Sequence, residues 1–115
     1  MTEVLSAVEP LSKRHDLANF DSGRPSLDTW LRRFSLGNQS SETTRTYVVH
    51  RATRVIGYFS LCAGSASRES VPNRVSRGLA NHPVPVIVLA RFAVERSQKG
   101  RGLGDAMLRE ALARC

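Results

Sequence analysis

Cysteine is nearly absent from this chain of 115 residues, which has only Cys62 and Cys115 and no CxxC pair. Two cysteines without such spacing predict neither a disulfide framework nor a zinc site, so no metal is expected. Histidine is also scarce. His15, His50 and His82 match no catalytic-triad order, and we expect each on the surface or in a loop.

Long apolar runs are missing too. The longest fall far short of a membrane span, and the first sixteen residues lack the basic and apolar regions of a secretion signal. We therefore expect a protein of the reducing cytoplasm with no membrane contact. The length suits one domain, which we take as residues 1–115.

Acidic residues are few beside the basic ones: 10 Asp and Glu against 17 Lys and Arg, a net charge of +7. Such an excess favours polyanionic partners such as nucleic acid, phosphorylated cofactors or anionic lipid. Solubility in an arginine-rich proteome is the alternative explanation. Since 41% of the residues are hydrophobic, the composition is that of a globular protein and excludes wholesale disorder.

The apolar pattern of the first third predicts a strand and then a helix. Alternation over Val4–Val8 predicts the strand. One helical face is formed by four residues at spacing i, i+3, i+4 and i+7, namely Leu27, Trp30, Leu31 and Phe34. Ser26 is placed to cap this helix, Asp28 lies in its first turn, and Gly37 is placed to end it. The tract "NQSSETT" then predicts a polar loop.

Two β-rich runs follow, "TYVVHR" and "RVIGYFSLCAG", and their short separation predicts a hairpin. Gly57 in the second run indicates a bulge or a close backbone approach. In the less regular segment 67–83, Val75 and Leu79 are suited to a short helix.

The mostly apolar run Val84–Val94 is typical of a central strand covered on both faces. A last helix is expected from about Leu103. Its apolar face would consist of Leu103, Met107, Leu108, Ala111 and Leu112.

Three alternating glycines, Gly100, Gly102 and Gly104, join this strand to this helix. Glycine permits positive φ and a close approach of backbone N–H groups to a ligand, and a helix N-terminus favours anions. Lys99 and Arg101 add positive charge, so the sequence predicts a phosphate or pyrophosphate site. A flexible connection without a ligand is the alternative. The string of a Walker loop does not occur, and the spacing departs from the G-x-G-x-x-G dinucleotide fingerprint.

The segment "KGRGLG" resembles the R/Q-x-x-G-x-G/A pyrophosphate loop of the GNAT N-acetyltransferase superfamily, with Lys99 at the Arg/Gln position and Gln98 as its alternative. Two longer segments, "DLANFDSGRPSLDTWL" and "VPVIVLARFAVERSQKGRGLGDAMLREAL", are similar to motifs of one branch, with Ser22 replacing its usual cysteine. That branch contains the toxins of toxin–antitoxin pairs that acetylate the amino group of aminoacyl-tRNA and block translation.

The resemblance implies an α+β fold: an incomplete GNAT domain whose mixed sheet has about four strands, with helices on both faces and the C-terminal strands absent. It implies acetyl-CoA as the cofactor. The backbone of Phe92 and Val94 would run along the pantetheine arm, and one of their N–H groups would polarise the thioester carbonyl. The cofactor-binding residues would be Phe92, Ala93, Val94, Lys99, Gly100, Arg101, Gly102, Leu103, Gly104 and Asp105. The substrate-binding residues would be Arg91, Arg77, Arg32 and Arg33.

The catalytic residue stays unknown, because the family's general acid is a tyrosine that would lie beyond Cys115, and Tyr47 and Tyr58 fall in early strands. Without a further strand, the run Val84–Val94 would have an unpaired edge, so we expect a fragment or a chain completed by a second copy or a partner.

The expected partners are aminoacyl-tRNA, a ribbon-helix-helix antitoxin and a second copy in a homodimer. Three alternatives stay open at this point. The chain is an inactive module that binds CoA, RNA or an antitoxin; or it acetylates a protein or a small amine; or it is a basic nucleic-acid-binding domain unrelated to CoA.

Overall fold

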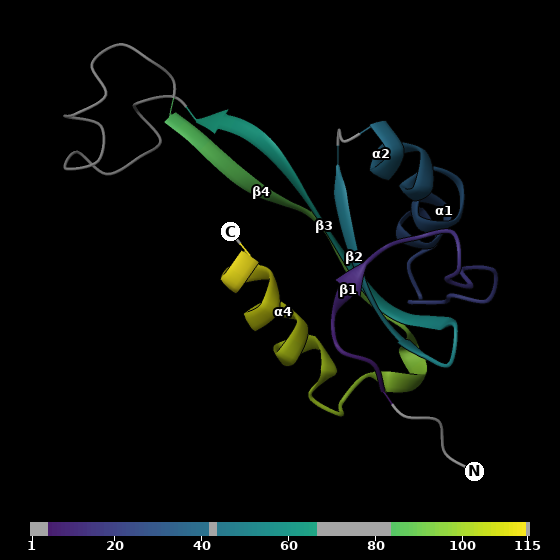
Figure 1. Cartoon of the computed structure of the whole chain (residues 1–115). Helices are drawn as coiled ribbons and strands as arrows, with labels where there is room; N and C mark the ends of the chain where they lie inside the picture. Colours follow the sequence, from purple (N-terminus) through teal and green to yellow (C-terminus); the bar gives the residue numbers. More distant parts are fainter. Residues whose placement is uncertain (1–4, 42–43, 67–83, 115) are drawn as a thin grey trace.

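The computed structural model describes residues 5–41, 44–66 and 84–114 (Figure 1). The elements occur in the order β1 (Glu9–Pro10), α1 (Pro25–Arg33), α2 (Ser35–Ser41), β2 (Arg45–Arg51), β3 (Arg54–Ala66), β4 (Val84–Val94), the 3-10 turn η2 (Arg96–Gln98) and α4 (Leu103–Arg114). The four strands form one sheet of order β1-β2-β3-β4, and all three pairings are antiparallel. The expected α+β fold of about four strands is confirmed, but the described sheet is antiparallel and not mixed as expected.

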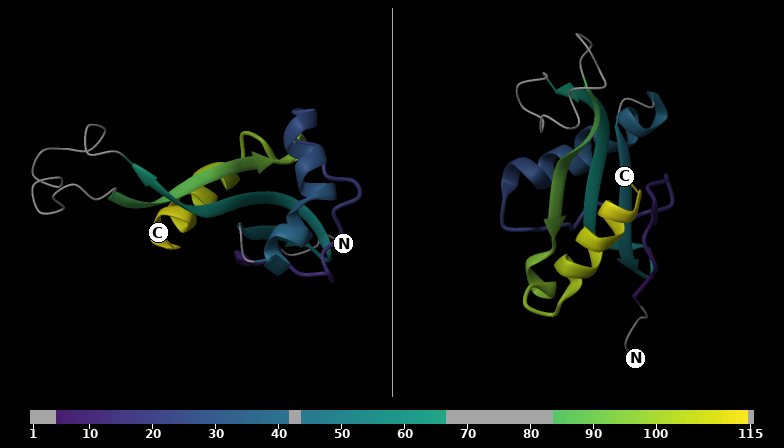
Figure 2. Two further views of the ribbon diagram at one scale, coloured as in Figure 1. Left: turned by 90° about the horizontal axis from the view of Figure 1, so that it is seen from above. Right: turned by 90° about the vertical axis from the view of Figure 1, so that its left-hand side faces the viewer.

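Helices cover both faces of this sheet, with α1 and α2 on one side and α4 on the other (Figure 2). Strand side chains alternate between the faces, so the neighbours Tyr58 and Phe59 belong to different cores. The core under α1 consists of Leu11, Leu17, Phe20, Trp30, Leu31, Val48, Val55, Tyr58 and Ala93. The core under α4 consists of Val49, Ile56, Phe59, Leu61, Val94, Leu103, Met107 and Ala111.

The first strand lies later than the sequence predicts. The expected strand Val4–Val8 is wrong: Leu5 forms only an isolated bridge with Arg51, and the ladder with β2 contains only Glu9 and Pro10. Pro10 lies at the outer edge with no N–H to expose, and beyond it the Leu11 N–H still donates to the Thr46 carbonyl of β2 at 2.9 Å. The segment before β1 nonetheless runs beside β2, because the Ser6 N–H donates to the His50 carbonyl at 2.8 Å.

The predicted helix is two helices. α1 begins at Pro25, a residue suited to the first helical position, so Ser26 is not its cap. It ends at Arg33 because the Ser35 hydroxyl donates to the Leu31 carbonyl at 2.5 Å, in competition with the helical backbone.

The second helix, α2, then continues through Gly37 into the tract predicted as a loop. Gln39 fastens it to the sheet: its side-chain oxygen accepts from the Thr46 N–H at 2.7 Å, and its nitrogen donates to the Thr46 carbonyl at 3.2 Å.

The β2–β3 hairpin is confirmed, as is the special role of Gly57. Val49 pairs with Gly57 and His50 with Val55, so Ile56 is an extra residue in a bulge. A Cβ on Gly57 would lie 2.6 Å from Sδ of Met107 in α4. Glycine here lets α4 approach the sheet closely.

Strand β4 has the predicted bounds but a different environment. It lies at the edge of the described sheet, and a second bulge leaves Ala90 unpaired between Arg91 and Leu89. Before this bulge the strand extends past the helices, and Ile87, Val88 and Leu89 are 40–52% exposed. The expectation of a strand covered on both faces is therefore wrong for this half of β4.

α4 starts at Leu103 as expected, but its apolar face is only partly covered, since Leu108 and Leu112 are 41% and 67% exposed. The short helix expected around Val75 and Leu79 falls outside the described residues. No helix in the described ranges combines the length and apolarity needed to cross a membrane.

Candidate functional site

The inner end of β4 leaves backbone donors unpaired on its free edge. The Glu95 N–H donates to the Ile56 carbonyl at 2.8 Å, and Ala93 lies opposite Tyr58 two residues earlier. In an antiparallel pair alternate residues bond the partner strand, so Ala93 and Glu95 bond β3. The N–H and carbonyl groups of Phe92 and Val94 therefore point away from β3. Their side chains lie in or against the core under α4, as expected.

The glycine-rich loop continues from this edge. Gly100 and Gly102 have φ of +81° and +82°, a region in which side chains are strained, and nothing lies within 4 Å of a Cβ built on either. Gly104 differs from both: its φ is not in the positive region, and a Cβ there would make an ordinary contact with the Val94 side chain at 3.9 Å.

Backbone N–H groups gather at this loop. The first described hydrogen bond of α4 runs from the Ala106 N–H to the Gly102 carbonyl at 3.2 Å, so the N–H groups of Leu103, Gly104 and Asp105 precede the helical ladder. Within the described residues those of Gly100 to Asp105 have no backbone acceptor. The loop and the helix N-terminus together suit an anion.

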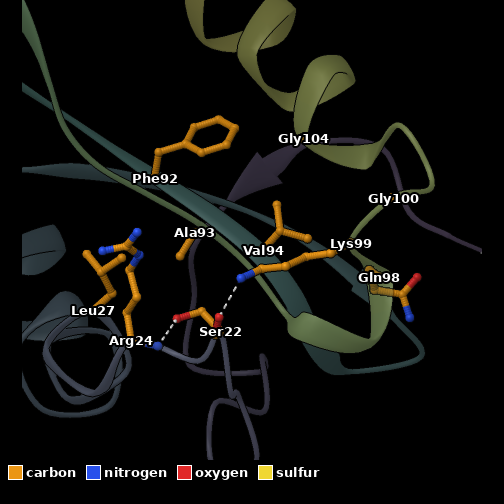
Figure 3. Close-up of a pocket in the computed structure, with 10 residues that line it drawn as sticks. All are labelled: Ser22, Arg24, Leu27, Phe92, Ala93, Val94, Gln98, Lys99, Gly100 and Gly104. Carbon is orange, nitrogen blue, oxygen red and sulfur yellow. Dashed lines mark hydrogen bonds between the residues drawn. The ribbon is translucent and has the colours of Figure 1, made fainter.

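A pocket of about 280 Å³ lies between the free edge of β4, the glycine-rich loop and the chain before α1 (Figure 3). Its lining is Ser22, Arg24, Leu27, Phe92, Ala93, Val94, Gln98, Lys99, Gly100 and Gly104. Six of these are cofactor-binding residues expected from the resemblance, so residues 92–94 of β4 and the loop meet at one cavity. Arg101, Gly102, Leu103 and Asp105 do not line it, and the first three line a neighbouring pocket of about 220 Å³.

Lys99 spans the pocket wall. Its ammonium donates to the Ser22 carbonyl at 2.8 Å, and Figure 3 shows the side chain reaching across from the loop. Gln98 is buried and donates to the Ser97 hydroxyl at 3.3 Å. Lys99 is therefore the side chain that brings a positive charge from the loop to the pocket.

The sequence analysis does not predict that the turn before α1 lines the pocket, through Ser22 and Arg24. Ser22 is 2% exposed and Asp28 5% exposed, and their side chains are hydrogen-bonded at 2.7 Å. Beside them, Asp21 pairs with Arg96 at 2.9 Å, and this hydrogen-bonded guanidinium lowers the pKa of the Asp21 carboxyl. The one signal in the sequence was the branch motif that places Ser22 and Asp28 at fixed spacing.

The arginines expected to bind substrate are spread out. The Arg91 guanidinium lies over the Trp30 ring, 4.1 Å from its centroid, so its partner among the described residues is an aromatic face. It lines a groove of about 760 Å³ with Trp30, Phe34 and five further residues. Arg32 donates to the Phe20 carbonyl at 2.9 Å, and Arg33 is exposed. Arg77 falls outside the described residues.

Neither tyrosine lines the pocket. Tyr58 donates to the Leu27 carbonyl at 2.8 Å, and burial raises the pKa of its hydroxyl. Tyr47 stacks on Phe59 and lies under the Arg114 guanidinium. No tyrosine in the described ranges is therefore placed as a general acid at this site.

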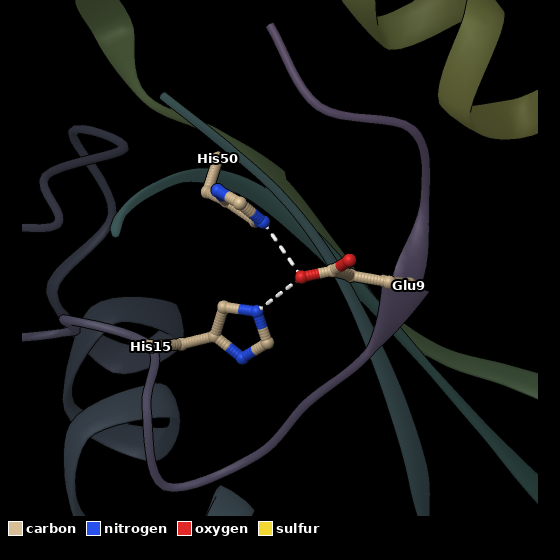
Figure 4. Close-up of side chains that lie close together, drawn as sticks. All are labelled: Glu9, His15 and His50. Atoms are coloured by element: carbon tan, nitrogen blue, oxygen red, sulfur yellow. Dashed lines mark hydrogen bonds and ion pairs between the residues drawn. The ribbon is translucent and has the colours of Figure 1, made fainter. Parts of the chain in front are cut away.

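Two histidines form a cluster at the opposite edge of the sheet (Figure 4). Oε1 of Glu9 lies 2.7 Å from Nε2 of His15 and 2.6 Å from Nε2 of His50. His15 lies in the loop between β1 and α1, as expected, although it is only 6% exposed, whereas His50 lies in β2, so the expectation of a surface or loop position is wrong for His50. A shared carboxylate partner is what permits their burial. His82 lies outside the described residues.

These three side chains are also of the types that bind zinc, with ligand atoms within 4.8 Å of one another. Their hydrogen bonds indicate that protons, and not a metal ion, lie between the histidine nitrogens and the carboxylate. The Ser12 N–H donates to Nδ1 of His15 at 3.0 Å, so Nε2 of His15 carries a proton toward Glu9. Nδ1 of His50 faces the Ala52 carbonyl and must donate, and its Nε2 faces the carboxylate. The cluster is best described as a Glu9 carboxylate that is hydrogen-bonded to both histidines and ion-paired with Arg14 at 2.5 Å.

No protein-family model matches the chain. A curated relative, the tRNA-acetylating toxin of Mycobacterium tuberculosis (strain ATCC 25618 / H37Rv), is 44% identical over 110 residues. The match covers 96% of this chain and 66% of the relative. The chain thus spans just under two thirds of that relative's length.

Solved structures of proteins with a similar fold also match this chain. The structure of AtaT complexed with acetyl-methionyl-tRNAfMet matches with a TM-score of 0.84 and 25% identity, over 94% of this chain and 66% of that one. The structure of AtaTR bound with AcCoA matches with a TM-score of 0.79 and 27% identity, over 95% of this chain and 66% of that one. The fold described above is therefore shared with proteins solved with a charged tRNA and with acetyl-CoA.

Proposed function

Because the chain belongs to the GNAT N-acetyltransferase superfamily and is related to its tRNA-acetylating toxins, we propose that it carries the acetyl-CoA site of an enzyme that acetylates the amino group of aminoacyl-tRNA. One observation supports this most directly. Phe92 and Val94, with N–H groups on the free edge of β4, line the same pocket as Gly100 and Gly104, whose N–H groups have no described backbone acceptor.

The residues present fit acetyl-CoA. A diphosphate needs several donors at once, and the backbone of Gly100 to Asp105 offers them at a helix N-terminus with Lys99 beside them. The amide groups of a pantetheine arm can pair with an open strand edge as an added strand would. When bound, acetyl-CoA supplies the acetyl group as a thioester. The N–H of Phe92 or Val94 would then polarise its carbonyl as an oxyanion-hole donor.

The acceptor is proposed from charge and shape. A net charge of +7 suits a large RNA, whose phosphates would be contacted by exposed arginines, Arg32 and Arg33 among them. Arg91 lines the groove next to the pocket, and we keep it, with Arg77, as a substrate contact. A catalytic acid is not assigned to any described residue.

Acetyl-CoA titration by calorimetry tests the cofactor site. Gly102→Asp puts a side chain at a φ of +82° and a negative charge where the diphosphate would lie, so we expect acetyl-CoA affinity to fall about 100-fold or more. Gly37→Asp is the matched control: a Cβ there also meets nothing within 4 Å, and the residue lies in α2 without positive φ. Full affinity in the Gly102 variant would refute the loop assignment.

Acetyl transfer to charged tRNA then separates the alternatives. Transfer supports the enzyme, whereas binding of acetyl-CoA without transfer supports an inactive module. A control with lysine-bearing peptides and small amines tests the other acceptors. Salt-sensitive RNA binding that Gly102→Asp leaves unchanged, without acetyl-CoA binding, would support an unrelated nucleic-acid-binding domain.

An antitoxin and a second copy of the chain are further proposed partners. The exposed apolar residues of β4 and α4 support an additional protein surface there, since patches of this kind mark interaction sites. Light scattering after gel filtration gives the mass in solution. A stable, well-folded monomer would contradict completion by a second copy.

A further inference from the structure

The buried carboxylate of Asp28 has an unusual set of partners. It lies in the first turn of α1 and is 5% exposed. Its oxygens accept the Ser22 N–H at 3.1 and 3.2 Å and the Ser22 hydroxyl at 2.7 Å. Among the described residues it has no ion-pair partner. A buried charge is costly unless it is well hydrogen-bonded, so these bonds with Ser22 determine where the turn lies.

The same turn holds the loop at the pocket. The Ser22 carbonyl accepts from the Lys99 ammonium at 2.8 Å, across 77 positions of the chain. One residue earlier, the Asp21 carbonyl accepts from the Arg96 N–H at 2.9 Å. The Ser22 hydroxyl also accepts from the Arg24 N–H at 3.2 Å, so both sides of this serine are fixed.

We propose that Asp28 is a positioning residue for binding of the acetyl-CoA diphosphate: through Ser22 it fixes the carbonyl that holds the Lys99 ammonium at the pocket wall. This inference rests on the proposed function. An ammonium has three donors, and the bond to Ser22 leaves two for phosphate oxygens. A lysine already ordered in the free protein loses less side-chain entropy when the ligand binds.

The attachment of α1 to the sheet has other sources. Trp30 and Leu31 are buried in the core under α1, and the Tyr58 hydroxyl donates to the Leu27 carbonyl at 2.8 Å. Every hydrogen-bond partner that the described residues offer the Asp28 side chain, by contrast, belongs to Ser22. Its contacts therefore shape the turn facing Lys99 and are separate from the apolar contacts that hold the helix.

Binding of two ligands to Asp28 variants tests the proposal without relying on turnover. One ligand is acetyl-CoA and the other is S-acetylpantetheine, which lacks the diphosphate. Asp28→Ala removes all three acceptor contacts, and we expect acetyl-CoA to bind about 10-fold more weakly while S-acetylpantetheine is unaffected. Asp28→Asn keeps an acceptor for the Ser22 hydroxyl and should restore most of the affinity. Asp16→Ala, at an exposed aspartate, is the control.

Lys99 supplies the second half of the test. Lys99→Met should weaken acetyl-CoA by a similar factor, and adding Asp28→Ala to it should cost little more, because both act through one contact. Lys13→Met is the matched control, since Lys13 is exposed and is the other lysine of the chain. If Asp28→Ala does not fold, Ser22→Ala replaces it, with a smaller loss of about 3-fold again confined to acetyl-CoA.

The outcomes are distinguishable. Equal weakening of both ligands, or full additivity of the Asp28 and Lys99 substitutions, overturns the positioning role and leaves the proposed function intact. Unchanged acetyl-CoA affinity in the Asp28 and Ser22 variants does the same. If the unsubstituted chain does not bind acetyl-CoA, the proposed cofactor site and this inference both fail.

Discussion

The two edges of the sheet are built in opposite ways. The β1 edge is a strand of two residues that ends in Pro10, and the Glu9 side chain next to it is bonded to two histidines. The β4 edge is eleven residues long and carries unpaired donors at Phe92 and Val94. A short strand with a proline is a common protection against unwanted pairing, whereas a long open edge invites an added strand or ligand.

This difference indicates where the backbone is free to bind a ligand. At the β1 edge the Glu9 carboxylate and the side chains of His15 and His50 are hydrogen-bonded to one another, so these groups stabilise the fold. At the β4 edge the free donors lead directly into a loop whose own N–H groups are unpaired and whose pocket is lined by Lys99. Function is therefore expected at the edge that the fold leaves open.

The largest expected contrast is in amide hydrogen exchange at the open edge. Ala93 and Glu95 donate to β3, so their amide protons should exchange at least about 100-fold more slowly than those of Phe92 and Val94. Acetyl-CoA should slow exchange at Phe92 and Val94 selectively. The measurement is by NMR on labelled protein. Equal protection of all four amides in the free chain would show that this edge is not open.

The loop after this edge gives a second contrast, between two glycines four positions apart. Gly100→Ala forces a side chain into φ of +81° and should destabilise the chain by about 1–2 kcal/mol. Gly104→Ala lies in α4 with only an ordinary contact to Val94, and should stabilise the chain by up to about 1 kcal/mol. Urea unfolding followed by circular dichroism gives both values. Changes of the same sign would contradict the assigned backbone roles.

The sequence predicted those features of the two edges that depend on local pattern. The bounds of β4 and the start of α4 follow from a run of apolar residues and from helical spacing, and both are as predicted. What it missed depends on distant partners. Lys99 contacts Ser22, 77 positions away, and His50 contacts Glu9, 41 positions away, so neither contact can be predicted from a local sequence pattern.

The wrong predictions have the same physical origin. Apolar residues over Val84–Val94 indicate burial, but burial depends on how far the helices extend, and they cover only the inner half of β4. No local pattern around His50 indicates its place in a strand beside Glu9, because that partner lies 41 positions away. At Ser35 a single hydroxyl bond to Leu31 divides the predicted helix, which periodicity cannot detect.

The closed edge yields the smallest effect, and it depends on pH. Hydrogen bonds from His15 and His50 lower the Glu9 pKa from 4.5 to about 2 in the folded chain. The unfolded chain therefore binds more protons in this interval, so stability from Glu9 is present above pH 4.5 and is lost as the pH falls to about 2. Unfolding curves in urea across this range should show the loss.

Glu9→Gln should remove this part of the pH dependence and lower stability at neutral pH, because an amide forms weaker hydrogen bonds with the histidines than a carboxylate does. Glu110→Gln is the control, because Glu110 is half-exposed and its ion pair with Arg114 is long, at 3.8 Å, and therefore weak. The pH dependence of stability in this variant should match that of the unsubstituted chain. If Glu9→Gln left the acid slope unchanged, the carboxylate would not be what fastens β1 to β2. The contrast between a closed and an open edge would then rest on the short strand and its proline alone.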